Sequence, residues 1–149
     1  TRIESSAASD VYKRQVSAAI GRIQLKRLEG WLARRRTIAD RYTEAFQGLP
    51  GLVVPAVRPA TEHAWHQYCL LVDEPEHLRH ILEEANIDSR VYYATPIHRQ
   101  QVYAGHEQFN ETLPVTDAIA HRLVAVPVHH QMTDDDVRRV IDAVVSSTR

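Results

Sequence analysis

A chain of 149 residues, 44% of them hydrophobic and 25% charged, is long enough to bury one hydrophobic core, and its composition excludes a disordered or collagen-like protein. Its net charge of −1 argues against broad electrostatic binding to nucleic acid or to an anionic membrane. The sequence contains no apolar run long enough to span a bilayer and no signal-peptide core. The single cysteine, Cys69, cannot form an internal disulfide, so we expect a reducing compartment, the cytoplasm.

Residues 16–47 are predicted to form one long helix. Apolar residues recur there at spacings of three, four and seven, from Leu25 to Phe46, which is typical of a helix with one buried face. Gly48 and Pro50 follow directly and predict the end of this helix, since glycine accepts a left-handed conformation and proline cannot continue the hydrogen-bond ladder.

The rest of the chain alternates predicted strands with predicted helices. The strands are expected over 52–55, 65–72, 89–93 and 124–128, and the helices over 73–87, 115–123 and 133–147. Pro75 suits a first helical position, Asn86 a left-handed stop, and Thr133 with Asp136 nearly forms a capping box. This order predicts an α+β fold, with a small sheet carrying helices on one face.

Two patterns that could indicate other functions are weak. The nine histidines include three close pairs without the cysteine or carboxylate partners of a metal site, so we expect no metal; the pairs are 63/66, 77/80 and 129/130. The basic segment RLEGWLARRR (27–36) shares its helix with acidic residues, which favours a solvated face over a nucleic-acid site.

The segment YYATPIHRQ (92–100) is a candidate binding loop. It places two tyrosines, Pro96 and His98 just past a predicted strand end, where sheets commonly present groups that contact ligands. A histidine on a rigid loop can bind a phosphate or a hydroxyl, or shuttle a proton. The spacing alone leaves a functional site and a plain loop scaffold equally open.

Several segments, in the same order, resemble the C-terminal part of the DegT/DnrJ/StrS sugar aminotransferases. They are AAIGRIQLKRLEGWLARRRTIADRYTEAF, HAWHQYCLLV, ANIDSRVYYATPIH and LPVTDAIAHRLVAVPVHHQMTDDDVRRVIDAV, and the resemblance covers residues 16–145. It implies the small C-terminal domain of an aspartate aminotransferase-like fold. Residues 16–47 would be the linking helix, and 48–149 a small, mainly antiparallel sheet with helices packed on it.

The resemblance also implies a function. Such enzymes are pyridoxal 5'-phosphate (PLP)-dependent homodimers with shared active sites, and they transfer an amino group, typically from glutamate, to a keto-sugar carried on a nucleotide. A tyrosine-proline-histidine loop reaches the sugar nucleotide in this family, and it matches Tyr93, Pro96 and His98. His98 is therefore the best substrate-binding candidate, with Tyr93 beside it and Arg99 as a weaker one.

The N-terminal segment SSAASDVYKRQ (5–15) departs from the family, which has an Asn-x-Arg-Met stretch before the long helix. Reverse translation of these residues permits, in frame at every codon, the end of a widely used transposase-based sequencing-library adaptor. We therefore expect residues 1–15 to be a processing scar that is not native, and the chain to be a truncated reading frame.

Lysine content limits the chemistry expected of this chain. PLP enzymes need a lysine to form the internal Schiff base, and the only lysines are Lys13, inside the scar, and Lys26, which does not match the family's cofactor lysine. We expect the chain to bind no PLP and to be inactive. The full-length parent protein, of which this chain would be a fragment, is expected to be the enzyme. Two alternatives stay open: a fragment of a related PLP-dependent sugar dehydratase, and a stand-alone interaction or dimerisation module.

Overall fold

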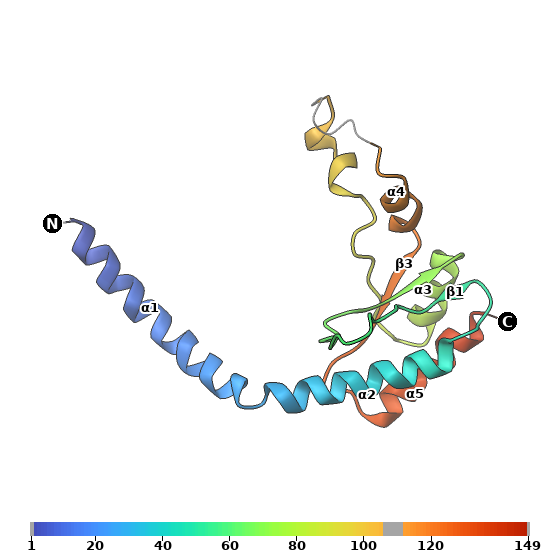
Figure 1. Cartoon of the computed structure of the whole chain (residues 1–149), viewed down its shortest axis with the longest axis horizontal. Coiled ribbons are helices and arrows are strands. Elements are labelled where there is room, and N and C mark those ends of the chain that lie inside the picture. The colour runs from blue at the N-terminus through green and yellow to red at the C-terminus, as the bar shows by residue number, and fades with distance from the viewer. Residues whose placement is uncertain (1, 106–111, 149) are drawn as a thin grey trace.

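The computed structural model describes residues 2–105 and 112–148, with side chains from residue 14 onward (Figure 1). The elements are α1 (Arg2–Leu25), α2 (Leu28–Phe46), β1 (Leu52–Val53), β2 (Tyr68–Val72), α3 (Pro75–Glu84), η1 (Ile97–Arg99), η2 (Gln101–Tyr103), α4 (Pro114–Ala120), β3 (Leu123–Val126) and α5 (Asp134–Ser146). The strands form an antiparallel sheet in the order β1-β2-β3. The α+β prediction is confirmed.

The core lies between one face of this sheet and the helices α2, α3 and α5. Along β2, the side chains of Tyr68, Leu70 and Val72 are buried, while those of Cys69 and Leu71 between them are half-buried. This alternation follows from the two-residue period of a strand that packs on one face only. Helices α2 and α5 run side by side beneath the sheet (Figure 1).

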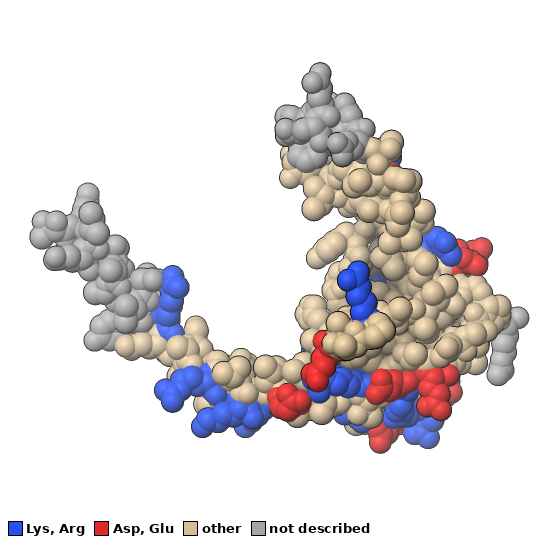
Figure 2. Space-filling model, in the orientation of Figure 1, with Lys and Arg blue, Asp and Glu red and all other residues tan. Residues whose placement is uncertain are grey.

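The predicted long helix is interrupted. It breaks at Lys26–Arg27, where the Arg27 amide donates to the Gln24 carbonyl at 2.9 Å, and α2 then begins in a new direction. Leu25 is 70% exposed and Leu28 41% exposed, so the apolar stripe becomes buried core only from Ile38 onward. Figure 1 shows α1 leaving the body as an isolated rod, and Figure 2 shows lysine and arginine side chains along the region of the break.

Residues 5–15 lie within α1, and a chain starting at Val16 tests whether they support the fold. Because residues 14–30 are all exposed, we expect this deletion to change the free energy of unfolding by less than about 0.5 kcal/mol. Urea denaturation of the two chains measures the difference. A loss above about 1 kcal/mol would show that the removed segment packs on the domain, contrary to its assignment as a scar.

Helix boundaries follow the predicted signals. Gly48 and Asn86 have positive φ angles of 85° and 55°, as expected of left-handed stops, and Pro75 opens α3. Thr133 and Asp136 form a complete capping box at the start of α5.

The predicted strand over 89–93 is wrong. Arg90 makes a single bridge to Ala125 of β3, with its amide donating to the Ala125 carbonyl at 3.1 Å and its carbonyl accepting from the Ala125 amide at 2.7 Å. The chain then turns away from the sheet into a projection, here called the arm, which comprises residues 91–105 and 112–122 (Figure 1). β3 itself continues past this bridge to Leu123, so the segment leaves the sheet although its β-rich composition favours a strand.

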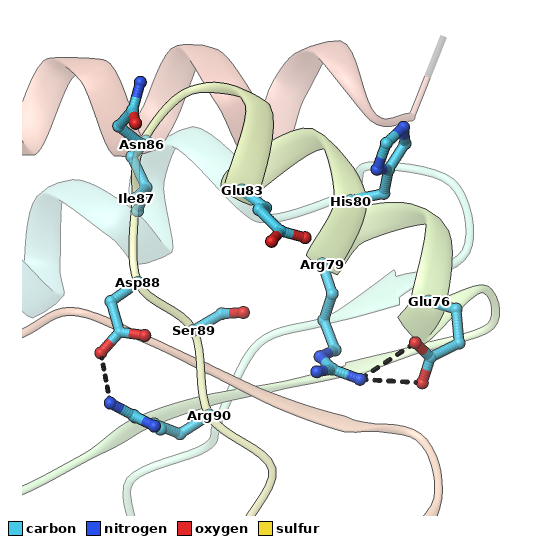
Figure 3. A pocket seen from close by; sticks show the side chains of 9 residues that line it. All are labelled: Glu76, Arg79, His80, Glu83, Asn86, Ile87, Asp88, Ser89 and Arg90. Atoms are coloured by element: carbon cyan, nitrogen blue, oxygen red, sulfur yellow. Dashed lines mark hydrogen bonds and ion pairs between the residues drawn. The ribbon is translucent and has the colours of Figure 1, made fainter.

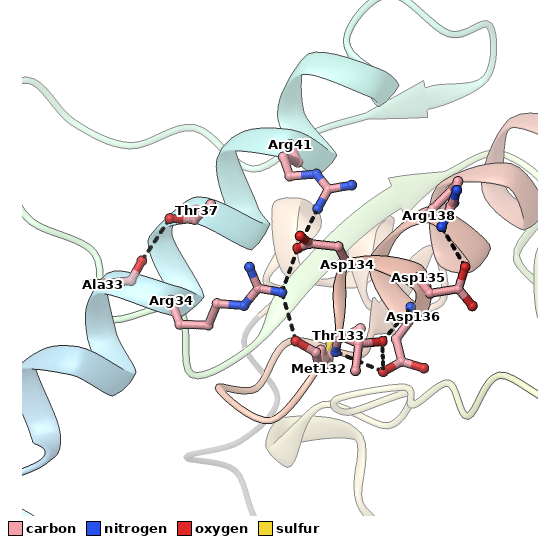
Figure 4. A network of polar contacts seen from close by, with 10 residues as sticks. All are labelled: Ala33, Arg34, Thr37, Arg41, Met132, Thr133, Asp134, Asp135, Asp136 and Arg138. Carbon is pink, nitrogen blue, oxygen red and sulfur yellow. Dashed lines mark hydrogen bonds and ion pairs between the residues drawn. The ribbon is translucent and has the colours of Figure 1, made fainter.

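Polar contacts tie α2 to the start of α5 (Figure 4). Arg34 donates to the Met132 carbonyl at 2.8 Å and to the Asp134 carboxylate at 2.9 Å, and Arg41 reaches the same carboxylate at 3.1 Å. The hydrogen bond and charge of Arg34 hold the pKa of Asp134 below its ordinary value. The contacts therefore join α2 to the start of α5 on the solvent side.

Replacing Thr133 with alanine tests the capping box. At neutral pH we expect a loss of about 1 kcal/mol in the free energy of unfolding. The hydrogen bonds from Thr133 hold the pKa of Asp136 below its ordinary value of 3.8, so the share of the stabilisation that depends on the ionised carboxylate is complete above that pH and is lost as the pH falls through the lower, folded-state pKa. Unfolding curves of both proteins at several pH values should therefore draw closer in acid without coinciding, because Thr133 Oγ1 still accepts from the Asp136 amide; a difference that stays constant would contradict the assignment.

Candidate functional site

A cavity of about 720 Å³ lies in the arm, between the loop that begins at Tyr92 and helix α4. The loop contributes Tyr92, Tyr93, Pro96 and His98, and α4 contributes Thr116, Ile119 and Ala120. Most of this lining is apolar, with a few polar groups, as is typical of pockets for small ligands. The structure therefore brings two of the predicted binding residues, Tyr93 and His98, to one cavity.

Local hydrogen bonds shape the loop. Pro96 fixes the bend before η1, and its carbonyl accepts from the Arg99 amide at 2.9 Å. The Ile97 carbonyl then accepts from the Gln100 amide at 3.1 Å. On the other side, Pro114 opens α4, where the Asp117 amide donates to the Leu113 carbonyl at 2.8 Å. Short helical turns thus set both walls of the cavity.

His98 is the most enclosed of the predicted residues. Its side chain is only 9% exposed, and its Nε2 lies 2.9 Å from Oδ1 of Asp117 on α4. Tyr93, in contrast, is 76% exposed at the rim of the cavity. The cavity therefore has an enclosed histidine in its wall and an exposed tyrosine at its rim.

Arg99 is placed differently from the other two candidates. Its Nη2 donates to Oδ2 of Asp117 at 2.7 Å and its Nε to Oδ1 at 3.2 Å, and Arg99 is not among the residues that line the cavity. The hydrogen bond from Arg99, followed by that from His98, holds the pKa of Asp117 below its ordinary value. Asp117 was missed in the sequence analysis, where its only signal was an acidic residue within the LPVTD segment.

A second hollow, of about 660 Å³, lies between α3 and the segment 86–90 (Figure 3). Its arginines are paired with carboxylates: Arg79 donates to both oxygens of Glu76 at 3.0 and 2.9 Å, and Arg90 donates to Asp88 at 2.9 Å. Paired charges leave little attraction for an anionic ligand, so the cavity in the arm is the better candidate site.

Three of the described histidines outside the arm have structural contacts. His63 accepts from the Trp65 amide at 3.0 Å, His80 lies 3.4 Å from Glu84, and the ring of His130 stacks on Trp31 at 4.5 Å. Among residues 2–105 and 112–148, no group of three histidine, cysteine or acidic side chains could hold a metal ion. None of the helices in the same residues is long and apolar enough to cross a membrane.

The described side chains do not fit PLP. Lys26 is exposed at the break between α1 and α2 and lines none of the cavities described above, so its amine is not placed to hold a cofactor aldehyde. Lys13 lies in the part of α1 whose side chains are not described. No chemical step through PLP is therefore assigned to this chain.

The α+β fold is shared with sugar aminotransferases of solved structure, of which this chain covers about a third. Residues 11–145 match the DegT/DnrJ/EryC1/StrS aminotransferase family, and the chain belongs to that family. The predicted resemblance is confirmed. The matched region includes residues 11–15 of the segment assigned to the adaptor.

Named relatives agree with this assignment. The chain is 32% identical to dTDP-3-amino-3,4,6-trideoxy-alpha-D-glucose transaminase of Streptomyces venezuelae, over 87% of this chain and 34% of that protein. It is 38% identical to the spore coat polysaccharide biosynthesis protein SpsC of Bacillus subtilis, over 87% of this chain and 35% of SpsC. The chain thus spans about a third of the length of the curated relatives it matches.

Solved structures show the same relationship. DesV of S. venezuelae, crystallised with a ketimine intermediate, superposes with a TM-score of 0.84 at 31% identity, covering 89% of this chain and 36% of DesV. The aminotransferase TlmJ of Streptoalloteichus hindustanus gives a TM-score of 0.80 at 32% identity, over 89% of this chain and 35% of TlmJ. The family consists of PLP-dependent aminotransferases, and its fold class is the one predicted.

Proposed function

We propose that this chain is the small-domain part of a PLP-dependent aminotransferase that converts nucleotide-linked keto-sugars to amino-sugars, for instance for cell-surface polysaccharide. The observation that carries the proposal is the cavity of the arm, with His98 and Tyr93 in its wall, in a chain of this family. Residues 16–47 would link the small domain, 48–149, to the part of the enzyme that supplies the lysine.

In this proposal the residues of the arm bind and orient the sugar nucleotide. Enclosed His98 offers a hydrogen-bonding group within an apolar wall, and exposed Tyr93 closes over the ligand from the rim. Arg99 acts through Asp117 and stiffens the loop. Such positioning raises the rate by holding the reacting carbon in one place.

The remaining assignments follow from the family. Glutamate would be the amino donor, and two copies of the enzyme would form a homodimer in which active sites are shared. Cys69, the one cysteine of the chain, is half-buried in β2, and burial raises the pKa of its thiol, consistent with a core residue of a protein in the reducing cytoplasm.

A reading frame extended upstream of Val16 provides the test. The purified extended protein should show PLP absorbance and should convert a dTDP-linked keto-sugar to the amino-sugar only when glutamate is present. A product that has lost water without gaining nitrogen would identify a dehydratase. A protein that binds neither PLP nor the nucleotide sugar would contradict the proposal and favour an interaction module.

A further inference from the structure

One carboxylate joins the two walls of the cavity. Asp117 lies on α4, and it receives three hydrogen bonds from the facing turn η1: one from His98 Nε2 at 2.9 Å and two from Arg99, at 3.2 and 2.7 Å. Its side chain is 29% exposed, and the pKa of its carboxyl is held below the ordinary value, so it is ionised at neutral pH. An ionised carboxylate only accepts hydrogen bonds.

This contact determines which nitrogen of His98 carries the proton. Because the carboxylate cannot donate, Nε2 must carry the hydrogen, and a neutral imidazole has only one. Nδ1 is then an acceptor. It is also the remaining polar atom of the ring, so a ligand that contacts the imidazole through a hydrogen bond must do so at Nδ1.

The described surroundings favour a hydroxyl over a phosphate as that ligand group. None of the described residues that line the cavity is a lysine or an arginine, and Arg99 is engaged with Asp117. Phosphate oxygens accept hydrogen bonds and would face the lone pair of a neutral Nδ1. A hydroxyl group can donate to Nδ1 without a counter-charge.

We propose that Asp117 is a positioning residue, which holds His98 as an Nε2–H tautomer, and that Nδ1 of His98 accepts a hydrogen bond from a sugar hydroxyl of the substrate. The identity of the ligand rests on the proposed function. The tautomer does not, because it follows from the contacts of the unliganded chain.

Long-range proton–nitrogen NMR of the histidine-labelled chain tests the tautomer. The wild-type chain should show a proton on Nε2 of His98 and none on Nδ1. In Asp117→Ala, both nitrogen shifts should move toward the average of the two tautomers. Arg99→Ala, which keeps the carboxylate, should retain the wild-type pattern. A proton on Nδ1, or an unchanged pattern in Asp117→Ala, would overturn the role of Asp117.

Ligand titration of the same samples tests the hydroxyl. Added dTDP-glucose should shift the Nδ1 signal of His98 in the direction of an acceptor that gains a hydrogen bond, and dTDP or inorganic phosphate should leave it unchanged. A shift with either phosphate probe alone would overturn the hydroxyl assignment. No response to dTDP-glucose would overturn both the hydroxyl assignment and the proposed function of the cavity. The role of Asp117 is tested separately, by the nitrogen shifts of the unliganded chain. As a control, the amide spectrum of each variant should be unchanged outside the arm, which shows that the variant is folded.

Discussion

Truncating Tyr42 to alanine is expected to lower the free energy of unfolding by about 4 kcal/mol. Tyr42 is fully buried on α2, and its ring stacks on Phe46 at 5.4 Å and meets Tyr68 of β2 edge-on at 5.3 Å. Its removal leaves a cavity where α2 meets the sheet. Such a loss is a large fraction of the stability of a domain of this size.

Tyr42→Phe is the matched control, because it keeps the ring and removes only the hydroxyl. The hydroxyl donates to the Pro127 carbonyl at 2.9 Å, so its loss should cost about 1 kcal/mol. Urea denaturation of the three proteins separates packing from hydrogen bonding. If the alanine variant lost no more stability than the phenylalanine variant, the aromatic cluster would not be the centre of the core.

Replacing His98 with alanine in the extended, PLP-containing protein is expected to raise the KM for the nucleotide sugar about tenfold, the equivalent of one hydrogen bond of about 1.4 kcal/mol. We expect kcat to change much less, since His98 binds the substrate and does not move the reacting proton. Steady-state kinetics with varied nucleotide sugar and saturating glutamate measure both constants.

His77→Ala provides the control for that substitution. His77 is an exposed histidine on α3, outside the arm, and its loss should leave both constants unchanged. If His98→Ala lowered kcat severely at constant KM, His98 would act in the chemical step, and the binding role proposed for it would be wrong.

Sequence patterns predicted the parts of the fold that depend on neighbouring residues. The helix α2, the buried strand β2 and the capping box at Thr133 each follow from a local period or from a residue with one strong preference. His98 and Tyr93 were identified as candidate binding residues because the family motif places them on one short loop.

Contacts between distant segments could not be predicted in this way. The strand expected over 89–93 required the chain to stay alongside β3 after Arg90, and nothing in the local sequence shows that it turns away into the arm there. Asp117 is 19 residues from His98, and only the folding of the arm brings the two together. The break at Lys26–Arg27 lies in a continuous helical pattern, where local propensity favours one helix.

Reading the genomic DNA upstream of the Val16 codon tests the central claim most directly. If the chain is part of a sugar aminotransferase, the reading frame should continue upstream without the adaptor sequence, through an Asn-x-Arg-Met stretch, to a lysine in a cofactor-binding context. Genomic DNA that encodes SSAASDVYKRQ after its own start codon would contradict the claim and would leave an interaction module in place of an enzyme.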